Sequence, residues 1–448
     1  MVKKYLYSYI LCCILLVQIV NCQSVNNDVF FNDLNCLRKE NFKRSWDAFE
    51  NYTPMKLTAR DNENFIEKVD SLLLIIGTDS IKETQVIYYY KLAFSDVTRK
   101  DPHFRIYPEL RVKNKRLKAK DINVLPFSLM CINDTLIVNQ SLCKDVDKGD
   151  RIIELDGISA STLLGFTYRD RYMNTILMQM QNHFHFSSNY NLILERRGKK
   201  IKLVCDGISL KVYNENFIKE KVECRIYDDI GYIRFDQFHN NGNIIKSFNK
   251  LIYDVKKKRG NSIIIDLRRN IGGSGDRFDD LISIFCDKNE VPYQKGVKLK
   301  VSEATFDYGF SRDSIGKIVS LPDSMFISKI PLNPKLYMGD YDYYVLVSRN
   351  THSQASTFTN IIQYNKLGRI VGENLQKNAL RYGEVMSAKF LKSVSYISTV
   401  EYDEYTNAID GILKPDIEIP YIASKYMQGG DPVLEKLIDI IKSTNEKN

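Results

Sequence analysis

Apolar residues follow three different patterns along the chain of 448 residues. From Asn62 to Phe94 they recur every three or four positions, the spacing of one face of an amphipathic helix. From about 119 to 212 they form short alternating runs between turn residues, which is typical of hairpins. From about 213 onward, apolar runs alternate with helical stretches. Since the chain is too long for one ordinary core, the pattern predicts a helical N-terminal domain at 23–118, a β-rich domain at 119–212 and an α/β core at 213–448.

The middle segment resembles a PDZ domain. Hairpins are predicted at Phe127–Val138 and Leu192–Val204. Between them lies Lys148–Gly157. Its Gly149-Asp150 is followed by alternating apolar residues and a final Asp-Gly, like the most recognisable strand of a PDZ domain. Such domains bind chain termini by strand addition and hold the carboxylate in a glycine-rich loop. The corresponding loop, Val124–Phe127, has no glycine, so carboxylate capture does not follow, and a generic hairpin pair stays open as the alternative.

The C-terminal half alternates strands with helices. Ser262–Leu267 is an apolar run of the kind that is buried in a parallel or mixed sheet, and Tyr343–Ser348 is another. Further strands are predicted at 231–235 and 368–372, and helices at 243–258 and 357–364. This alternation predicts a layered α/β core.

The N-terminus has the features of a signal peptide. Two lysines precede the apolar stretch Tyr5–Val20, which is too short for a comfortable membrane span. Residues 1–22 are therefore predicted to direct export. Cleavage after Cys22 would release the chain, whereas Ile19–Cys22 also resembles a bacterial lipobox, so a lipid anchor at Cys22 stays open. We expect a location in the cell envelope, as a periplasmic protein or outer-membrane lipoprotein, or secretion.

Charge and cysteine content exclude several classes of site. The formal net charge is +9, but the basic residues are scattered and no aromatic residues interleave with them, so we expect no nucleic-acid groove. No Cys-x-x-Cys pair is present, and neither a metal nor a cofactor is implied. An oxidising compartment would permit disulfides, whose pairing the sequence does not reveal. The cysteines beyond the leader are Cys36, Cys131, Cys143, Cys205, Cys224 and Cys286.

Two segments of the core carry residues suited to chemistry. Asp266–Ser274 runs from a strand into a Gly-Gly loop whose backbone N–H groups could face an anion, and it lacks the Gly-Lys-Ser/Thr of a phosphate loop. Ser353 lies just past a buried strand and opens a helix, where a hydroxyl can be exposed for nucleophilic attack. The simpler interpretations are a plain tight turn and a serine that caps its helix.

Taken together, these segments resemble one family. Asp-Leu-Arg-x-Asn-x-Gly-Gly, Thr-x-Ser-x-Ala some eighty residues later, Val371-Gly372-Glu373 and Gly411–Ile417 follow the order of motifs in tail-specific (C-terminal-processing) and tricorn-type serine peptidases of the bacterial exported branch. The resemblance covers about 120–420. It implies a layered α/β (α+β) peptidase core with PDZ-like and helical N-terminal domains, a polypeptide substrate and no cofactor.

The resemblance also implies roles for individual residues. Ser353 is the expected nucleophile, and the N–H of Gln354 with the Gly272-Gly273 loop forms the expected oxyanion hole. In tail-specific peptidases the base is a lysine, whose counterpart here is Asn378, with Lys377 one position early.

Tricorn-type members instead take a histidine that precedes the PDZ domain. Asp101-Pro102-His103 looks like their Asp-Gly-His segment, so we choose His103, with Lys377 as the alternative base. Their orienting glutamate corresponds to Ala408 here, and we choose the nearby Asp410 in its place.

These substitutions leave a rival hypothesis open. A family member that has lost the chemistry could act as a peptide- or protein-binding protein of the envelope.

Overall fold

The computed structural model describes residues 39–445 with gaps at 77–89, 91–92, 109–110, 113–114, 117, 119, 121–122, 133, 162–188, 218–221, 274, 304, 306–308, 391–392 and 429. The predicted signal peptide, Cys22 and Cys36 lie outside the described residues. Within the described part, no helix is long and apolar enough to cross a membrane. The cysteines described there form no disulfide with one another: Cys131, Cys143, Cys205, Cys224 and Cys286.

The chain forms two compact units. Unit 1 contains residues up to 110 together with 293–329 and 377–405. Unit 2 contains 111–292, 330–376 and the remainder from 406. The predicted β-rich segment and most of the predicted core therefore share one unit, while two later segments return to the N-terminal one. The predicted domains are continuous ranges of sequence, whereas each compact unit combines several separate segments. The predicted boundaries therefore stay a prediction.

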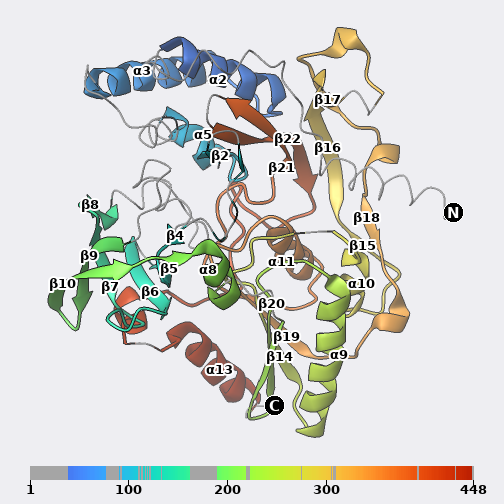
Figure 1. Ribbon diagram of the computed structural model, residues 1–448. Coiled ribbons are helices and arrows are strands. Elements are labelled where there is room, and N and C mark those ends of the chain that lie inside the picture. The colour runs from blue at the N-terminus through green and yellow to red at the C-terminus, as the bar shows by residue number, and fades with distance from the viewer. Residues whose placement is uncertain are drawn as a thin grey trace. The chain divides into compact units, whose positions relative to one another are not determined.

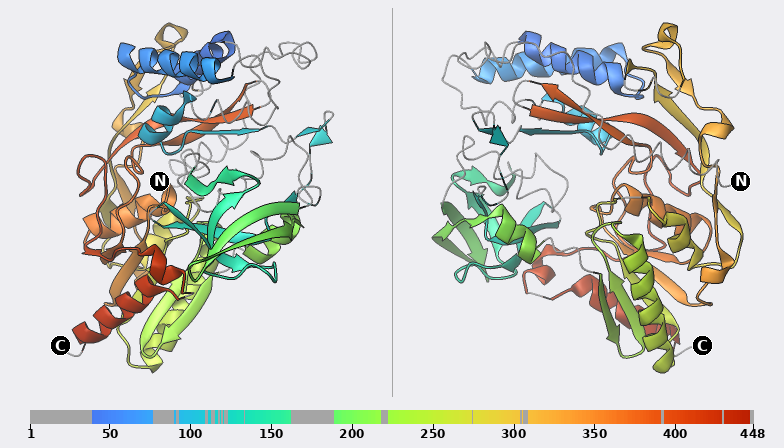
Figure 2. Two further views of the ribbon diagram at one scale, coloured as in Figure 1. Left: turned by 90° about the vertical axis from the view of Figure 1, so that its left-hand side faces the viewer. Right: turned by 45° about the vertical axis from the view of Figure 1, so that its right-hand side comes forward.

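Unit 1 is an antiparallel sheet covered by helices. Its strands lie in the order β1-β22-β16-β17, and β21 also pairs with β22. Apolar residues one helical turn or two apart, Phe42, Trp46 and Phe49, pack together with Tyr382 and Ile397 of the sheet. Figures 1 and 2 show these helices in blue across the red strands. The elements are α2 (Lys39–Tyr52), α3 (Ala59–Ile76), α5 (Ser95–Lys100), β1 (Arg105–Pro108), β16 (Gln294–Lys300), β17 (Ile318–Ser320), β21 (Tyr382–Phe390) and β22 (Ser393–Glu404).

The first sheet of unit 2 contains both predicted hairpins. Its strand order is β10-β9-β7-β6-β5, with the short β8 on β7. The first hairpin turns through Asp134, whose φ of 57° suits a tight turn, and the second pairs Leu192 with Leu203. The elements are β4 (Asn123–Val124), β5 (Phe127–Ile132), β6 (Thr135–Ser141), β7 (Arg151–Leu155), β8 (Ile158–Ser159), β9 (Asn189–Arg196), β10 (Lys199–Asp206), β11 (Ile208–Ser209) and α8 (Leu210–Phe217). The PDZ assignment of this segment stays a prediction.

The second sheet of unit 2 is the predicted mixed sheet. Its order is β12-β13-β14-β19-β20-β23; β12 runs antiparallel to β13 and the other pairings are parallel. Every residue of β14 is buried, as the apolar run predicted. The elements are β12 (Glu223–Tyr227), β13 (Ile230–Arg234), α9 (Asn241–Lys257), β14 (Ser262–Asp266), α10 (Phe278–Ser283), β19 (Asp342–Val347), α11 (Gln354–Tyr364), β20 (Arg369–Gly372), β23 (Ile417–Glu418), α12 (Ala423–Tyr426) and α13 (Pro432–Asn445). The layered α/β fold is confirmed.

Helices cover both faces of this sheet. On one face, Leu437 of α13 packs with Ile264 and Leu346, and Ile137 of β6 joins the same core. On the other face, Phe285, just after α10, contacts Phe248 of α9, Phe358 of α11 and Tyr343 of β19. Figure 1 shows α9 and α13 on opposite sides of β14 and β19. The carboxyl ends of β14 and β19 lead directly into the two segments with candidate chemistry.

Candidate active site

Ser353 occupies a strained position at the start of α11. Its backbone has φ 56° and ψ −128°, an arrangement that costs a non-glycine residue about 1–3 kcal/mol. Its side chain makes no capping hydrogen bond, although it stands at the N-cap position of the helix. The side chain is half-buried. A capping role therefore does not explain this serine, and backbone strain of this kind is typical of functional residues on sharp strand-to-helix turns.

Hydrogen bonds attach the serine segment to the glycine segment. The hydroxyls of Ser348 and Thr351 donate to the carbonyls of Arg268 (2.7 Å) and Leu267 (2.8 Å). The N–H of His352 donates to the carbonyl of Asn270 at 3.0 Å. Because these groups are buried, each unmade bond would cost about 1–3 kcal/mol. The position of Ser353 is thus determined by the loop that follows β14.

The two glycines of that loop are required for different reasons. A Cβ atom at Gly272 would lie 2.6 Å from Cβ of Ser353 and 2.9 Å from the nitrogen of Gln354. A Cβ atom at Gly273 would lie 2.4 Å from the carbonyl oxygen of Phe238. Both also have positive φ, 95° and 146°. The structure therefore brings Ser353, Gln354, Gly272 and Gly273 together, as the sequence predicted.

Hydrogen bonding distinguishes the N–H groups around Ser353. The N–H of Gly272 already donates to the side-chain oxygen of Asn270 at 2.9 Å, and the Asn270 amide donates to the carbonyl of Phe235 at 2.8 Å. By contrast, the N–H groups of Gly273 and Gln354 donate to no other residue in the described part of the chain. Two backbone donors beside a strained serine are suited to an oxyanion.

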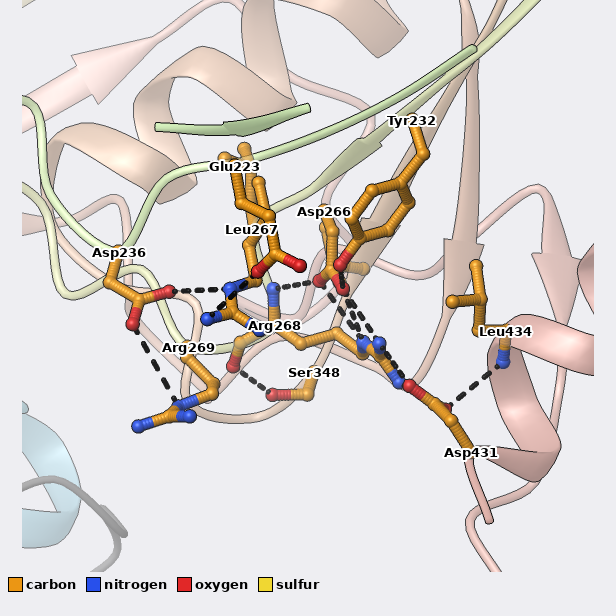
Figure 3. Close-up of polar contacts among 12 residues, drawn as sticks. Glu223, Tyr232, Asp236, Asp266, Leu267, Arg268, Arg269, Ser348, Asp431 and Leu434 are labelled. Carbon is orange, nitrogen blue, oxygen red and sulfur yellow. Dashed lines mark hydrogen bonds and ion pairs between the residues drawn. The ribbon is translucent and has the colours of Figure 1, made fainter. Parts of the chain in front are cut away.

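An ion-pair network holds the start of the glycine loop (Figure 3). The guanidinium of Arg268 binds Asp266 (2.6 Å) and Asp431 (2.7 Å), and the hydroxyl of Tyr232 donates to Asp266 at 2.9 Å. Burial acts to raise the pKa of Asp266, but the charge and hydrogen bonds of Arg268 outweigh it and keep that pKa below its ordinary value. Asp431 also accepts the N–H of Leu434 in the first turn of α13. The network thereby links the C-terminal helix to the loop beside Ser353.

His103 lies in unit 1, in the turn between α5 and β1. It is buried, with 8% of its surface exposed. Its backbone N–H donates to Oδ1 of Asp101 at 2.8 Å, and the carbonyl of Asp101 accepts the N–H of Phe104. Phe104 packs on Phe49 in the aromatic core beneath the turn, 5.0 Å between ring centroids. The turn is therefore fixed by packing as well as by hydrogen bonds.

Asp101 is an unusual carboxyl group that the sequence did not single out. It is fully buried, which raises its pKa to about 6 against the opposing effects of the Ser398 hydroxyl, the N–H groups of His103 and Phe104, and the charge of Arg105. Strongly shifted carboxyl groups cluster at functional sites. Its place in the sequence could have indicated it, because Asp101 stands two positions before the histidine that we chose as the base.

The alternative base and its neighbour also belong to unit 1. Lys377 is exposed and forms no hydrogen bond or ion pair within the described part of the chain. Asn378, at the position of the tail-specific lysine, has φ 60° and donates its side-chain N–H to the carbonyl of Lys100 at 2.8 Å. In this chain, Asn378 therefore binds the end of α5, just before the turn that carries His103.

Asp410 lies in unit 2 on the surface. It has φ 51° in a tight turn that the hydrogen-bonded pair Ile409 and Ile412 closes. Its exposed carboxylate makes no hydrogen bond or ion pair with described residues. Its predicted role as the orienting carboxylate stays a prediction.

Comparisons with known proteins identify the core. Residues 229–419 match the model of peptidase family S41. Mature CPAF complexed with lactacystin is similar over 92% of this chain and 99% of its own, with 14% identity and a TM-score of 0.60. Mature CPAF alone is similar over 88% of this chain and 95% of its own, with 13% identity and a TM-score of 0.56. The photosystem II D1 C-terminal processing protease is similar over 85% of this chain and 92% of its own, with 13% identity and a TM-score of 0.45. No curated protein matches the chain.

Residues 229–419 form a peptidase family S41 domain. The match spans both the glycine loop and Ser353, and the likeness to the CPAF structures shows the same fold. The order of the motifs predicted a peptidase core of this type, and the match agrees with that prediction over residues 229–419.

The remaining motifs of this S41 domain have structural explanations. Asp416 accepts the N–H of Ile370 at 2.7 Å and one N–H of Gln363 at 2.9 Å, so it joins β20 to α11. A Cβ atom at Gly372 would lie 2.2 Å from the carbonyl oxygen of Val347. Glu373 accepts the N–H of Arg349 through its carboxylate at 3.3 Å. These residues hold the serine segment in place rather than supplying reactive groups.

Gly272→Ala is expected to lower kcat of the S41 domain at least about 100-fold, because the new methyl group would displace Ser353 and the Gln354 N–H by a distance on the order of 1 Å. Gly275→Ala is the matched control, since a Cβ atom there meets nothing within 4 Å. Steady-state turnover of a peptide substrate measures both. Similar losses in the two variants would show that the contact at Gly272 is not the cause.

Asp101→Asn is expected to raise the free energy of unfolding at alkaline pH. The folded carboxyl has a raised pKa, about 6 instead of 3.8, so its contribution to stability is complete below pH 3.8 and is lost as the pH rises through 6. A neutral amide avoids that loss, which amounts to at most about 3 kcal/mol at pH 8. Urea unfolding at pH 8 and pH 3.5 measures the difference. The same difference at both pH values would contradict the burial of an ionised carboxylate.

Proposed function

We propose that the chain is a serine-type peptidase, an exported endopeptidase or processing protease that cleaves polypeptides through an acyl-enzyme on Ser353. The observation that carries the proposal is the strained Ser353, whose side chain makes no capping bond, beside the N–H groups of Gly273 and Gln354, which donate to no other described residue. Export rests on the charged and apolar leader at 1–22. The mass of the mature N-terminus would distinguish cleavage after Cys22 from lipidation of Cys22.

The proposed reaction is acyl transfer to water. His103 takes the proton of the Ser353 hydroxyl, and the oxygen attacks a peptide carbonyl. The N–H groups of Gly273 and Gln354 donate to the oxyanion, and one such donor typically contributes about 3 kcal/mol. His103 then returns the proton to the leaving amine, and water hydrolyses the ester. Imidazole suits both steps because its ordinary pKa lies near neutrality.

The test is hydrolysis of an unfolded protein such as casein by the purified chain. We expect new peptide termini to accumulate, and a serine-directed fluorophosphonate to stop the reaction. Intact casein, together with no fluorophosphonate labelling, would contradict the proposal and favour the rival hypothesis of a peptide- or protein-binding protein without activity.

A further inference from the structure

The carboxylate of Asp101 lies against the imidazole of His103. Oδ1 of Asp101, which accepts the backbone N–H of His103, is also 3.9 Å from Nδ1 of its ring. The Asp101 side chain is completely buried and 10% of the His103 side chain is exposed. The two groups therefore lie next to each other in a place that water hardly reaches.

We propose that Asp101 is the positioning carboxylate of His103, a role for which the sequence favoured Asp410. The inference rests on the proposed function, in which His103 is the base. The carboxylate stabilises the ring when it carries the proton of Ser353, and it holds the Nδ1 side of the ring. Nε2, on the opposite side, is then the nitrogen that exchanges the proton. At 3.9 Å the contact acts through charge rather than through a hydrogen bond.

The surroundings of Asp101 make its charge effective. The titratable and polar groups that face it are Arg105 at the start of β1, Ser398 of β22 and Tyr382 of β21. Burial first, and then the charges of Glu401 and Asp101, raise the pKa of Tyr382 to about 12, so Tyr382 stays neutral. Arg105 favours the ionised form of Asp101. The rest of the environment is the apolar core of unit 1, in which a charge is weakly screened.

Other acidic residues, in β22 and in the surface turn at Asp410, have different surroundings. Glu401 forms an ion pair with Arg381 at 2.8 Å. Glu404 is the last residue of β22 and pairs with Gln294, whereas Arg105 pairs with Tyr396 near the start of that strand. Asp403 and Asp410 are exposed.

Asp101 also shapes the turn, so the test must separate charge from structure. Asp101→Asn keeps one oxygen that can accept the N–H of His103, removes the charge and replaces the other oxygen by an NH₂ group. The matched control is Asp61→Asn, which removes a carboxylate of the same unit that pairs with Lys100. The measurement is the second-order rate of fluorophosphonate labelling of Ser353, in which Ser353 displaces fluoride, on the full chain from pH 4.5 to 9.

Removal of a charge next to the ring should lower the pKa of His103. In Asp101→Asn we expect the acidic limb of the profile to move down by about one pH unit or more, with labelling at least about tenfold slower at pH 7.5. Asp61→Asn should match the wild type. Slower labelling with an unmoved limb would show a purely structural role and would overturn the inference.

Failure of the proposed function looks different. If the wild type does not label, or if His103→Ala labels as fast as the wild type, the assignment of Ser353 or His103 fails first. Should Asp101→Asn not fold, titration of ring-labelled histidine in the wild-type chain decides, with His103→Gln to assign the signal. We expect a pKa for His103 above its ordinary value of about 6.5; a value at or below it would overturn the inference.

Discussion

Replacement of Ser353 by alanine is expected to abolish peptide hydrolysis. In serine peptidases the loss of the nucleophile lowers kcat by a factor on the order of 10⁶, and binding and the oxyanion hole account for the activity that remains. The fold should persist, because the Ser353 side chain makes no capping bond that alanine would lose.

Ser356→Ala is the matched control on the same helix. The Ser356 hydroxyl is buried and donates to the carbonyl of Thr351 at 3.1 Å, so its loss should cost about 1 kcal/mol of stability. Turnover should stay within a few-fold of the wild type. Initial rates on casein and thermal unfolding measure both variants. Activity in Ser353→Ala, or equal losses in both variants, would exclude Ser353 as the nucleophile.

The second large effect concerns the base. His103→Ala is expected to lower kcat by at least about 10³-fold, because the serine hydroxyl then has no group to take its proton. Lys377→Ala should change kcat by less than about twofold, since the Lys377 side chain is exposed and forms no contact within the described residues. Turnover in the two variants at pH 7.5 compares them directly.

The opposite result would select the other branch of the family. Full activity in His103→Ala with loss in Lys377→Ala would indicate a serine–lysine dyad. It would also remove the basis for a role of Asp101, because that role acts through His103.

The pattern of apolar residues predicted the core well. Ser262–Leu267 and Tyr343–Ser348 were predicted as buried strands, and β14 and β19 lie there side by side in parallel. A wholly buried parallel strand leaves a continuous apolar run, which sequence reveals directly. The two motifs around Gly272 and Ser353 were also predicted, because the residues within each motif are close in sequence and each has a fixed geometric task.

The assembly of unit 1 was beyond what the pattern shows. Its sheet joins β1 to β22, which lie nearly three hundred residues apart in sequence. The sequence pattern contains no information on which strands pair across such a separation. The predicted core at 213–448 therefore contains two segments, 293–329 and 377–405, that belong to the same compact unit as the N-terminal helices.

Burial explains why Asp101 was not chosen. An aspartate before Pro102 reads as an exposed turn residue, and Asp410 was selected by its spacing from a motif instead. Only the packing of Phe104 into the aromatic core shows that the turn is buried. Likewise, nothing in the sequence distinguishes Gly272 from Gly273, because the hydrogen bond that the Gly272 N–H donates to Asn270 depends on side-chain geometry.

The most direct test of the central claim is to find where a fluorophosphonate attaches. After labelling of the full chain and digestion with trypsin, mass spectrometry should place the whole modification in the peptide of residues 350–366 and, within it, on Ser353. The label should be absent from Ser353→Ala. Modification of another serine, or an unmodified 350–366 peptide from a folded wild-type chain, would contradict the assignment of Ser353 as the nucleophile.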